Sequence, residues 1–161
     1  MKSPAALIAV VCVVAGCGYS TRYVAPQGVR TVAVSVLENR TLYSGVEFEL
    51  TDAIIKEIAS KTPLRIAAAG EADAQLRGSL QDYGLRVLRR DTEGAVAEYQ
   101  LRALVNMELI STDTGETLRK VDGAGWELSY LPIRGETEEA ARLELLRRLA
   151  RKVVARTFET W

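Results

Sequence analysis

The chain has 161 residues with 21 basic and 21 acidic side chains, a formal net charge of zero, and no histidine. Without histidine it lacks the commonest general base and imidazole metal ligand, which argues against a Ser-His-Asp hydrolase and a histidine-ligated zinc enzyme. The balanced charge argues against a broadly basic nucleic-acid-binding domain, and we expect no nucleic-acid partner. The length fits one domain, and 48% hydrophobic residues can form a buried core.

The first residues have the pattern of a lipoprotein signal peptide. Lys2 precedes an apolar run over residues 5–14, which two small residues and Cys17 follow. The run is shorter than the about 20 apolar residues of a membrane-spanning helix and predicts a secretory signal. The residues before the cysteine resemble the bacterial lipobox, in which cleavage occurs before a cysteine that carries diacylglycerol. We therefore expect residues 1–16 to be a signal peptide and Cys17 to be the lipid-attachment residue; a plain secretory peptide with an incidental cysteine is the alternative.

The expected cleavage also sets the chemistry of the mature N-terminus. It removes Cys12, the other cysteine, so no intramolecular disulfide is expected. Several lipid chains on Cys17 would suffice for stable anchoring. Gly18 stands where enterobacterial lipoproteins retained at the inner membrane have aspartate, and by that resemblance this chain is expected at the outer membrane. Residues 17–28 show no periodicity and are expected to form a lipidated tether.

A strand and a helix are predicted after the tether. Alternating valines predict a strand over residues 29–37. Ser44 and Glu47 have the spacing of a capping box, and apolar residues at helical spacing predict a helix that ends near Ser60. Residues 64–67 are a short strand candidate.

Three long strands and a second helix are predicted for the remaining chain. Alternation predicts strands over residues 74–90, 96–110 and 117–130, joined by two turns. An amphipathic helix is predicted over residues 136–158. The element order predicts that residues 29–161 form a single α+β domain, a two-layer sandwich of two amphipathic helices on a mostly antiparallel four-stranded sheet.

The second predicted helix has glutamates at its start and a basic cluster near its end. The cluster consists of Arg147, Arg148, Arg151, Lys152 and Arg156. This order complements the helix dipole on a solvated face; binding of nucleic acid or anionic lipid is the alternative use of the cluster.

No arrangement of side chains in the sequence suggests catalysis. The acidic pairs fall at helix starts or in turns, and no glycine-rich phosphate loop is present, so we expect no enzymatic activity, no cofactor and no metal site. For binding, Arg86, Arg89 and Arg90 lie among apolar residues near the first hairpin tip, a mixture that suits phosphates together with acyl chains. Arg119 and Lys120, near the second turn, are expected at the same end of the sheet. The alternative is that these residues belong to a solvent-exposed strand edge, where charged side chains prevent pairing with another chain.

Several segments resemble the LptE family of lipopolysaccharide-assembly lipoproteins. They are Cys17-Gly18-Tyr19-Ser20, VRTVAVSVLENRT at 29–41, EFELTDAIIKEI from Glu47, ADAQLRGSLQDY at 72–83 and STDTGETL at 111–118. The resemblance implies two helices on a four-stranded sheet, and a lipoprotein on the periplasmic side of the outer membrane. It also implies a plug inside the LptD β-barrel that supports barrel assembly and lipopolysaccharide delivery to the cell surface. Members are reported to bind lipopolysaccharide through basic loop residues at one end of the sheet, for which Arg89, Arg90, Arg119 and Lys120 are the nearest candidates by position.

The segment VAVSVLENRT also resembles the first strand of two other kinds of lipoprotein. One kind activates penicillin-binding proteins and needs a long linker after the lipid cysteine, whereas about a dozen residues separate Cys17 from the predicted strand here. The other is the curli-secretion lipoprotein CsgG, which is longer and has pore-forming hairpins. The alternative function is therefore a periplasm-facing lipoprotein of either kind with a similar fold.

Overall fold

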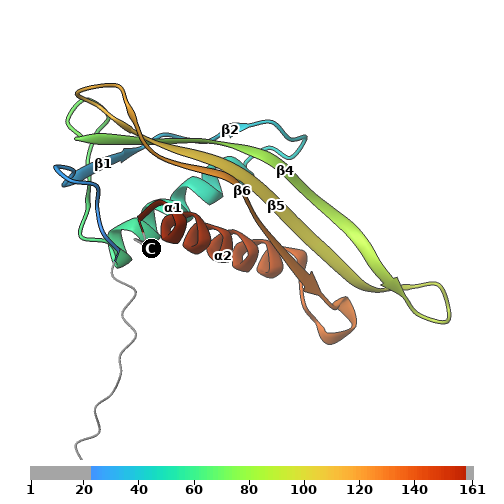
Figure 1. The fold of residues 1–161 in the computed structure, drawn as a ribbon. Helices are drawn as coiled ribbons and strands as arrows, with labels where there is room; N and C mark the ends of the chain where they lie inside the picture. Colours follow the sequence, from blue (N-terminus) through green and yellow to red (C-terminus); the bar gives the residue numbers. More distant parts are fainter. Residues whose placement is uncertain (1–22, 159–161) are drawn as a thin grey trace, which may run out of the picture.

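A twisted sheet with two helices on one of its faces makes up the described part of the molecule (Figure 1). The computed structural model describes residues 23–158, so the predicted signal peptide and Cys17 lie outside the described residues. In chain order the elements are β1 (Thr31–Val34), β2 (Glu38–Asn39), α1 (Val46–Lys61), β3 (Arg65–Ile66), β4 (Ala74–Arg90), β5 (Val96–Ser111), β6 (Thr117–Tyr130), a 3-10 turn η1 (Pro132–Arg134) and α2 (Glu138–Phe158).

The three long strands form an antiparallel meander, as predicted. β4 and β6 have the predicted bounds, and β5 extends one residue further than expected. Leu76 and Leu80 of β4 and Leu101 and Val105 of β5 are fully buried, because their side of the sheet is covered by the helices. The long alternating patterns therefore identify correctly which side of these strands forms the core.

The rest of the sheet differs from the prediction of four mostly antiparallel strands. The described sheet has six strands in the order β3-β1-β4-β5-β6, with β2 also paired to β4. β1 is parallel to both of its neighbours, and β2 is parallel to β4. The physical reason is the connection: the chain passes through α1 before β4 begins, and such a crossover brings the two strands together in the same direction.

The strand predicted over residues 29–37 is broken into two pieces. β1 ends at Val34, and the chain then turns so that Val36 is 55% exposed and Leu37 is buried. The Leu37 amide donates to the Thr51 hydroxyl oxygen on α1 at 3.2 Å. This bond holds the turn against the helix, and β2 then continues the pairing along β4.

The predicted capping box at the start of α1 is wrong. Gly45, not Ser44, is the N-cap residue; its φ is +94°, and no side chain caps the helix. Glu47 does not reach back to the cap. Its carboxylate accepts a hydrogen bond from the Asn39 side-chain amide at 2.7 Å and so links the helix start to β2.

The helices pack side by side over the core. The predicted apolar stripe of α2 is confirmed, with Leu145, Leu149 and Val153 completely buried. Near the start of both helices, the Arg142 guanidinium Nε lies 3.1 Å from the Glu49 carboxylate. None of the helices in residues 23–158 is long and apolar enough to cross a membrane.

Candidate functional site

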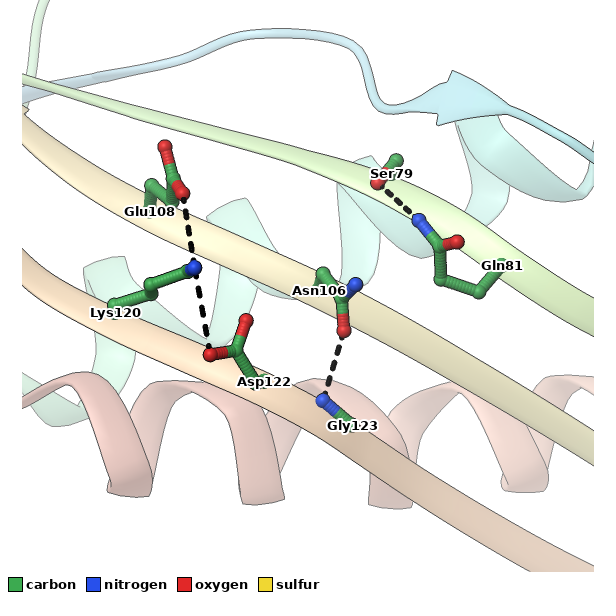
Figure 2. A network of polar contacts seen from close by, with 7 residues as sticks. All are labelled: Ser79, Gln81, Asn106, Glu108, Lys120, Asp122 and Gly123. Atoms are coloured by element: carbon green, nitrogen blue, oxygen red, sulfur yellow. Dashed lines mark hydrogen bonds and ion pairs between the residues drawn. The ribbon is translucent and has the colours of Figure 1, made fainter.

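The sheet surface that points away from the helices is polar, and we call it the open face. Side chains alternate along a strand, so the residues between the buried positions of β4, β5 and β6 project to this side. Figure 2 shows part of the open face in front of the strands, with the helices behind. Its charged residues are Arg40, Arg77, Arg86, Arg89, Arg102 and Lys120 together with Glu38, Asp82, Glu98, Glu108, Asp122 and Glu127.

A network of polar contacts joins β5 to β6 on the open face, and a further contact between Ser79 and Gln81 lies within β4 (Figure 2). Lys120 lies between two carboxylates, with its Nζ 3.8 Å from Glu108 and 3.5 Å from Asp122. Beside it the Gly123 amide donates to the Asn106 side-chain oxygen at 2.8 Å. A shallow depression of about 290 Å³ lies over these residues. The network holds β5 against β6 and leaves the depression nearly balanced in charge.

The same balance continues along the open face towards the β4–β5 hairpin. Arg102 is paired with Asp82 at 2.7 Å. Further along, Arg86 lies 3.9 Å from Glu127, and Arg89 lies 3.6 Å from Glu98. Exposed pairs of this kind contribute at most about 1 kcal/mol each and are screened by salt. The arginines are therefore compensated but held loosely enough to exchange partners.

The predicted binding residues do not share one end of the sheet. Arg90 pairs with Val96 at the β4–β5 turn, whereas Arg119 pairs with Leu109 close to the β5–β6 turn. The two turns lie at opposite ends (Figure 1), separated by roughly 40 Å at about 3.3 Å per residue. The expectation that Arg119 and Lys120 lie beside the hairpin arginines is wrong, because successive turns of a meander alternate between the ends of the strands.

The β4–β5 hairpin projects beyond the rest of the sheet (Figure 1). β6 ends at Tyr130, which pairs with Tyr99 and stacks on it with 5.4 Å between ring centroids. Past this point the hairpin has two strands. Val87 and Leu88 are 42% and 46% exposed there, next to the exposed arginines predicted as binding residues. The hairpin arm, residues 86–98, thus combines cationic and apolar side chains on one projecting element.

Arg90 has a structural task in the hairpin turn. Its guanidinium donates to the Gly94 carbonyl oxygen at 2.9 Å. The Asp91 carboxylate accepts hydrogen bonds from the amides of Glu93 and Ala95, both at 2.9 Å. The turn is therefore built by its own side chains, and Arg86 and Arg89 are the freer cations of the arm.

A buried polar cluster beneath the helices was not predicted from the sequence. The Tyr83 hydroxyl on β4 is buried without a hydrogen-bond partner among residues 23–158. Burial raises the pKa of Tyr83 to about 12, and the nearby Arg142 partly opposes this rise. The ion pair between Arg142 and Glu49 lies near it; its two contacting atoms are buried, although both side chains are about one third exposed, and they are not aligned as a hydrogen bond. Three separate elements contribute these groups, so no local pattern in the sequence marks them.

The remaining polar residues of the described chain do not suggest a metal centre. Within residues 23–158, no three His, Cys, Asp or Glu side chains are grouped so that they could hold a metal ion. The carboxylates of the open face lie opposite arginine or lysine side chains instead. The arrangement is suited to surface recognition through ion pairs and hydrogen bonds.

Comparison with known proteins gives one family match and several structural likenesses. Residues 29–157 match the model of the LptE family, described as lipopolysaccharide-assembly. No curated protein matches the sequence. The PelC dodecamer from Paraburkholderia phytofirmans is 17% identical with a TM-score of 0.52, covering 85% of this chain and 96% of that chain.

Two further solved structures have a similar fold. Uncharacterized lipoprotein B from Nitrosomonas europaea is 16% identical with a TM-score of 0.50, over 86% of this chain and 88% of that chain. Lipoprotein GNA1162 from Neisseria meningitidis is 8% identical with a TM-score of 0.50, over 76% and 96% of the two chains. At these identities the likeness shows the fold alone.

Proposed function

Because the chain belongs to the LptE family of lipopolysaccharide-assembly proteins, we propose that it supports the assembly of an LptD-type outer-membrane β-barrel and lipopolysaccharide transport to the cell surface. The family match over residues 29–157 is the observation that carries this proposal. In this function the protein is a lipoprotein attached through Cys17 on the periplasmic side of the outer membrane. It acts as a plug within its partner and takes no part in covalent chemistry.

The open face supports a role as a plug. The interior of a large outer-membrane barrel is polar, so a protein lodged there needs a surface of hydrogen-bonding and charged groups. The open face has this composition, and its acidic and basic residues alternate across neighbouring strands. Such a surface can exchange its internal ion pairs for pairs with a partner at little cost, because each exposed pair is weak.

The hairpin arm is the better of the two predicted places for lipopolysaccharide binding. Arg86 and Arg89 are held by contacts of 3.9 and 3.6 Å and lie beside exposed Val87 and Leu88. Guanidinium groups bind phosphate well, and neighbouring apolar side chains suit acyl chains. Lys120, at the other end of the sheet, lies between two carboxylates that compensate its charge.

Co-purification tests the proposed partner. A tagged form extracted from outer membranes is expected to bring down a large β-barrel protein. Recovery of a peptidoglycan synthase instead would favour the alternative, a lipoprotein that activates penicillin-binding proteins, and a ring of copies of this chain would favour a secretion-type assembly. Cys17→Ser is expected to leave an uncut precursor, because the cysteine to be acylated before cleavage is missing.

Lipopolysaccharide binding is tested separately at the two ends of the sheet. The double variant Arg86→Gln/Arg89→Gln is expected to weaken binding at least about ten-fold, because the loss of even one charge-assisted hydrogen bond of about 1.5 kcal/mol corresponds to that factor. Arg119→Gln/Lys120→Gln is expected to have a smaller effect. The matched control is Lys56→Gln/Arg65→Gln, which removes two charges from exposed positions elsewhere. Equal affinity for the hairpin variant and the control would mean that Arg86 and Arg89 do not bind lipopolysaccharide and only form a solvent-exposed strand edge.

A further inference from the structure

A second basic surface lies on the other side of the molecule, where α2 passes the edge strand β6. A cavity of about 560 Å³ opens there between the helix and the strand. We call it the basic groove; its lining includes Tyr23, Trp126, Glu144, Arg148, Arg151 and Lys152. Neither the open face nor the hairpin arm contributes to it, so the proposed function leaves this groove unexplained.

The charge of the basic groove is strongly one-sided. From Leu145 to the end of α2 at Phe158 the helix has no acidic residue, and three residues of the predicted basic cluster in this stretch, Arg148, Arg151 and Lys152, line the groove. Glu144 is the only acid in the lining, and it is already shared between Arg147 at 3.0 Å and Arg148 at 2.7 Å. Arg151 forms no ion pair or hydrogen bond within residues 23–158, although its charge adds to the hydrogen bond of Arg148 in lowering the pKa of Glu144. Compensation of the helix dipole needs cations only in the last turn, so it does not account for a row that begins three turns earlier.

Aromatic side chains lie among these cations. The Lys152 ammonium lies 5.6 Å from the centre of the Trp126 ring and donates to the Gly125 carbonyl oxygen at 2.8 Å. Tyr23 lines the same cavity. Tryptophan and tyrosine are enriched at the headgroup level of membranes, where an apolar ring and a polar edge are both satisfied. Together with lysine and arginine they form the combination that suits an anionic lipid surface.

The basic groove is also the place where the chain enters the described domain. The Val24 amide donates to the Phe158 carbonyl oxygen at 2.7 Å, which ties the incoming chain to the end of α2. Cys17 precedes Tyr23 by six residues. At 3.3–3.6 Å per residue those residues span at most about 20 Å. A lipid on Cys17 therefore keeps the groove within about 20 Å of the acyl chains.

We propose that the basic groove docks onto the headgroups of anionic phospholipids in the membrane that holds the lipid anchor. Arg148, Arg151 and Lys152 contact the phosphates, and Trp126 lies at the headgroup level. Docking makes the side of the domain that carries β6 and α2 face the bilayer, and it concerns the lipid-anchored protein before it is lodged in its barrel partner. The inference rests on the lipid attachment at Cys17 in the proposed function, but it does not depend on the barrel or on lipopolysaccharide.

Fluorescence of Trp126 in the processed, lipidated protein tests this docking. Trp161→Phe leaves Trp126 as the single tryptophan, because the chain has two. The protein is reconstituted into vesicles whose lipids carry bromine near the headgroup, made of phosphatidylcholine alone or mixed with phosphatidylglycerol. Quenching relative to unbrominated vesicles is expected to be stronger with phosphatidylglycerol and to weaken as salt is added.

Variants in the same background separate the groove from general charge. Arg148→Gln/Arg151→Gln/Lys152→Gln is expected to weaken docking about a hundred-fold, since each cation near an anionic surface contributes about five-fold. The matched control Lys56→Gln/Arg65→Gln/Arg134→Gln removes the same charge from exposed positions elsewhere and is expected to retain the quenching. Circular dichroism verifies that both variants are folded.

Two results would overturn the docking proposal, and they are distinguishable. If the intact mass shows acylation at Cys17 but quenching is the same in both kinds of vesicle, or the same for both triple variants, the docking is wrong and the basic cluster serves another partner. If the mass shows no acylation, the anchor in the proposed function is wrong, and the docking fails with it. Neither result depends on whether the protein binds lipopolysaccharide.

Discussion

Gly78 on β4 is a place where one missing side chain makes room for the core. A Cβ atom at this position would overlap the Met107 sulfur and lie 2.6 Å from the Asn106 carbonyl oxygen. Met107 is fully buried and cannot move aside freely. Gly78→Ala is therefore expected to lower the free energy of unfolding by about 1–3 kcal/mol in urea denaturation. Gly84→Ala on the same strand has nothing within 4 Å of the new Cβ and should be neutral or slightly stabilising. An equal loss of unfolding free energy in both variants would contradict this account of the packing.

The Tyr83 hydroxyl gives the molecule a stability that falls at alkaline pH. Burial raises its pKa to about 12, above the value of about 10 expected in the unfolded chain. The free energy of unfolding is therefore not lowered by this group below about pH 10, and it falls as the pH rises from there towards 12. Tyr83→Phe should remove much of this decline and leave neutral stability unchanged or about 1 kcal/mol higher, since an unpartnered hydroxyl is removed. Denaturant unfolding between pH 8 and 12 measures this decline in stability, with Tyr43→Phe on the exposed partner ring as the control.

At the scale of single residues, the sequence predicts the buried side of long strands but not contacts between separate elements. Leu76 and Leu101 are expected in the core because their strands alternate over many residues. The cluster of Tyr83, Glu49 and Arg142 joins β4, α1 and α2, and only the packed fold brings these groups together. Val36 illustrates the same limit, because a valine that continues the alternation is exposed where the strand breaks.

At the scale of elements, Asp73 fastens the short strand β1 to the start of β4. One oxygen of its carboxylate accepts hydrogen bonds from the Arg30 amide at 2.8 Å, the Thr31 amide at 2.9 Å and the Thr31 hydroxyl at 2.8 Å. These bonds, that of the Arg30 amide first, lower the pKa of Asp73 below its ordinary value. The contribution to stability is therefore present above about pH 4 and is lost as the pH falls through the lowered pKa.

The variant Asp73→Ala tests this fastening. It is expected to lower the denaturation midpoint at neutral pH and to make stability less dependent on pH in the acid range, because the titrating group is gone. Hydrogen exchange should report faster opening of β1 than of β5. Asp113→Ala, in the exposed turn between β5 and β6, is the control. Similar exchange in β1 for both variants would show that the hydrogen bonds of Asp73 are dispensable.

Elements are predictable in proportion to their length. The patterns of β4, β5, β6 and α2 repeat over 14 to 21 residues, and their predicted bounds agree with the structure to within two residues. β2 and β3 have two residues each, too few to show a period, and their parallel pairing is decided by the crossover through α1. The misplacement of Arg119 and Lys120 is an error in topology, since adjacent turns of a meander lie at opposite ends.

At the scale of the whole molecule, the hairpin arm is separable from the core. Of the residues from Leu88 to Glu98 only Ala97 is buried. Val87 and Tyr99 are paired across the strands, so Asn-Gly in place of residues 88–98 can close a two-residue hairpin. The shortened protein is expected to keep its thermal midpoint within a few degrees, about what a change of 1 kcal/mol produces, but to lose lipopolysaccharide binding. Loss of folding, or unchanged binding, would contradict this division of roles.

The hydrogen bond between Val24 and Phe158 joins two residues from nearly opposite ends of the sequence. Half of the helical layer belongs to α2, and its nine buried residues come last in the chain. For a chain secreted N-terminus first, as the proposed lipoprotein is, the sheet has no complete cover and the entering segment has no docking place until α2 has followed the strands across the membrane. Such long-range closure is slow. The order of events thus leaves the segment around Cys17 accessible to the modifying enzymes while the domain behind it is still incomplete.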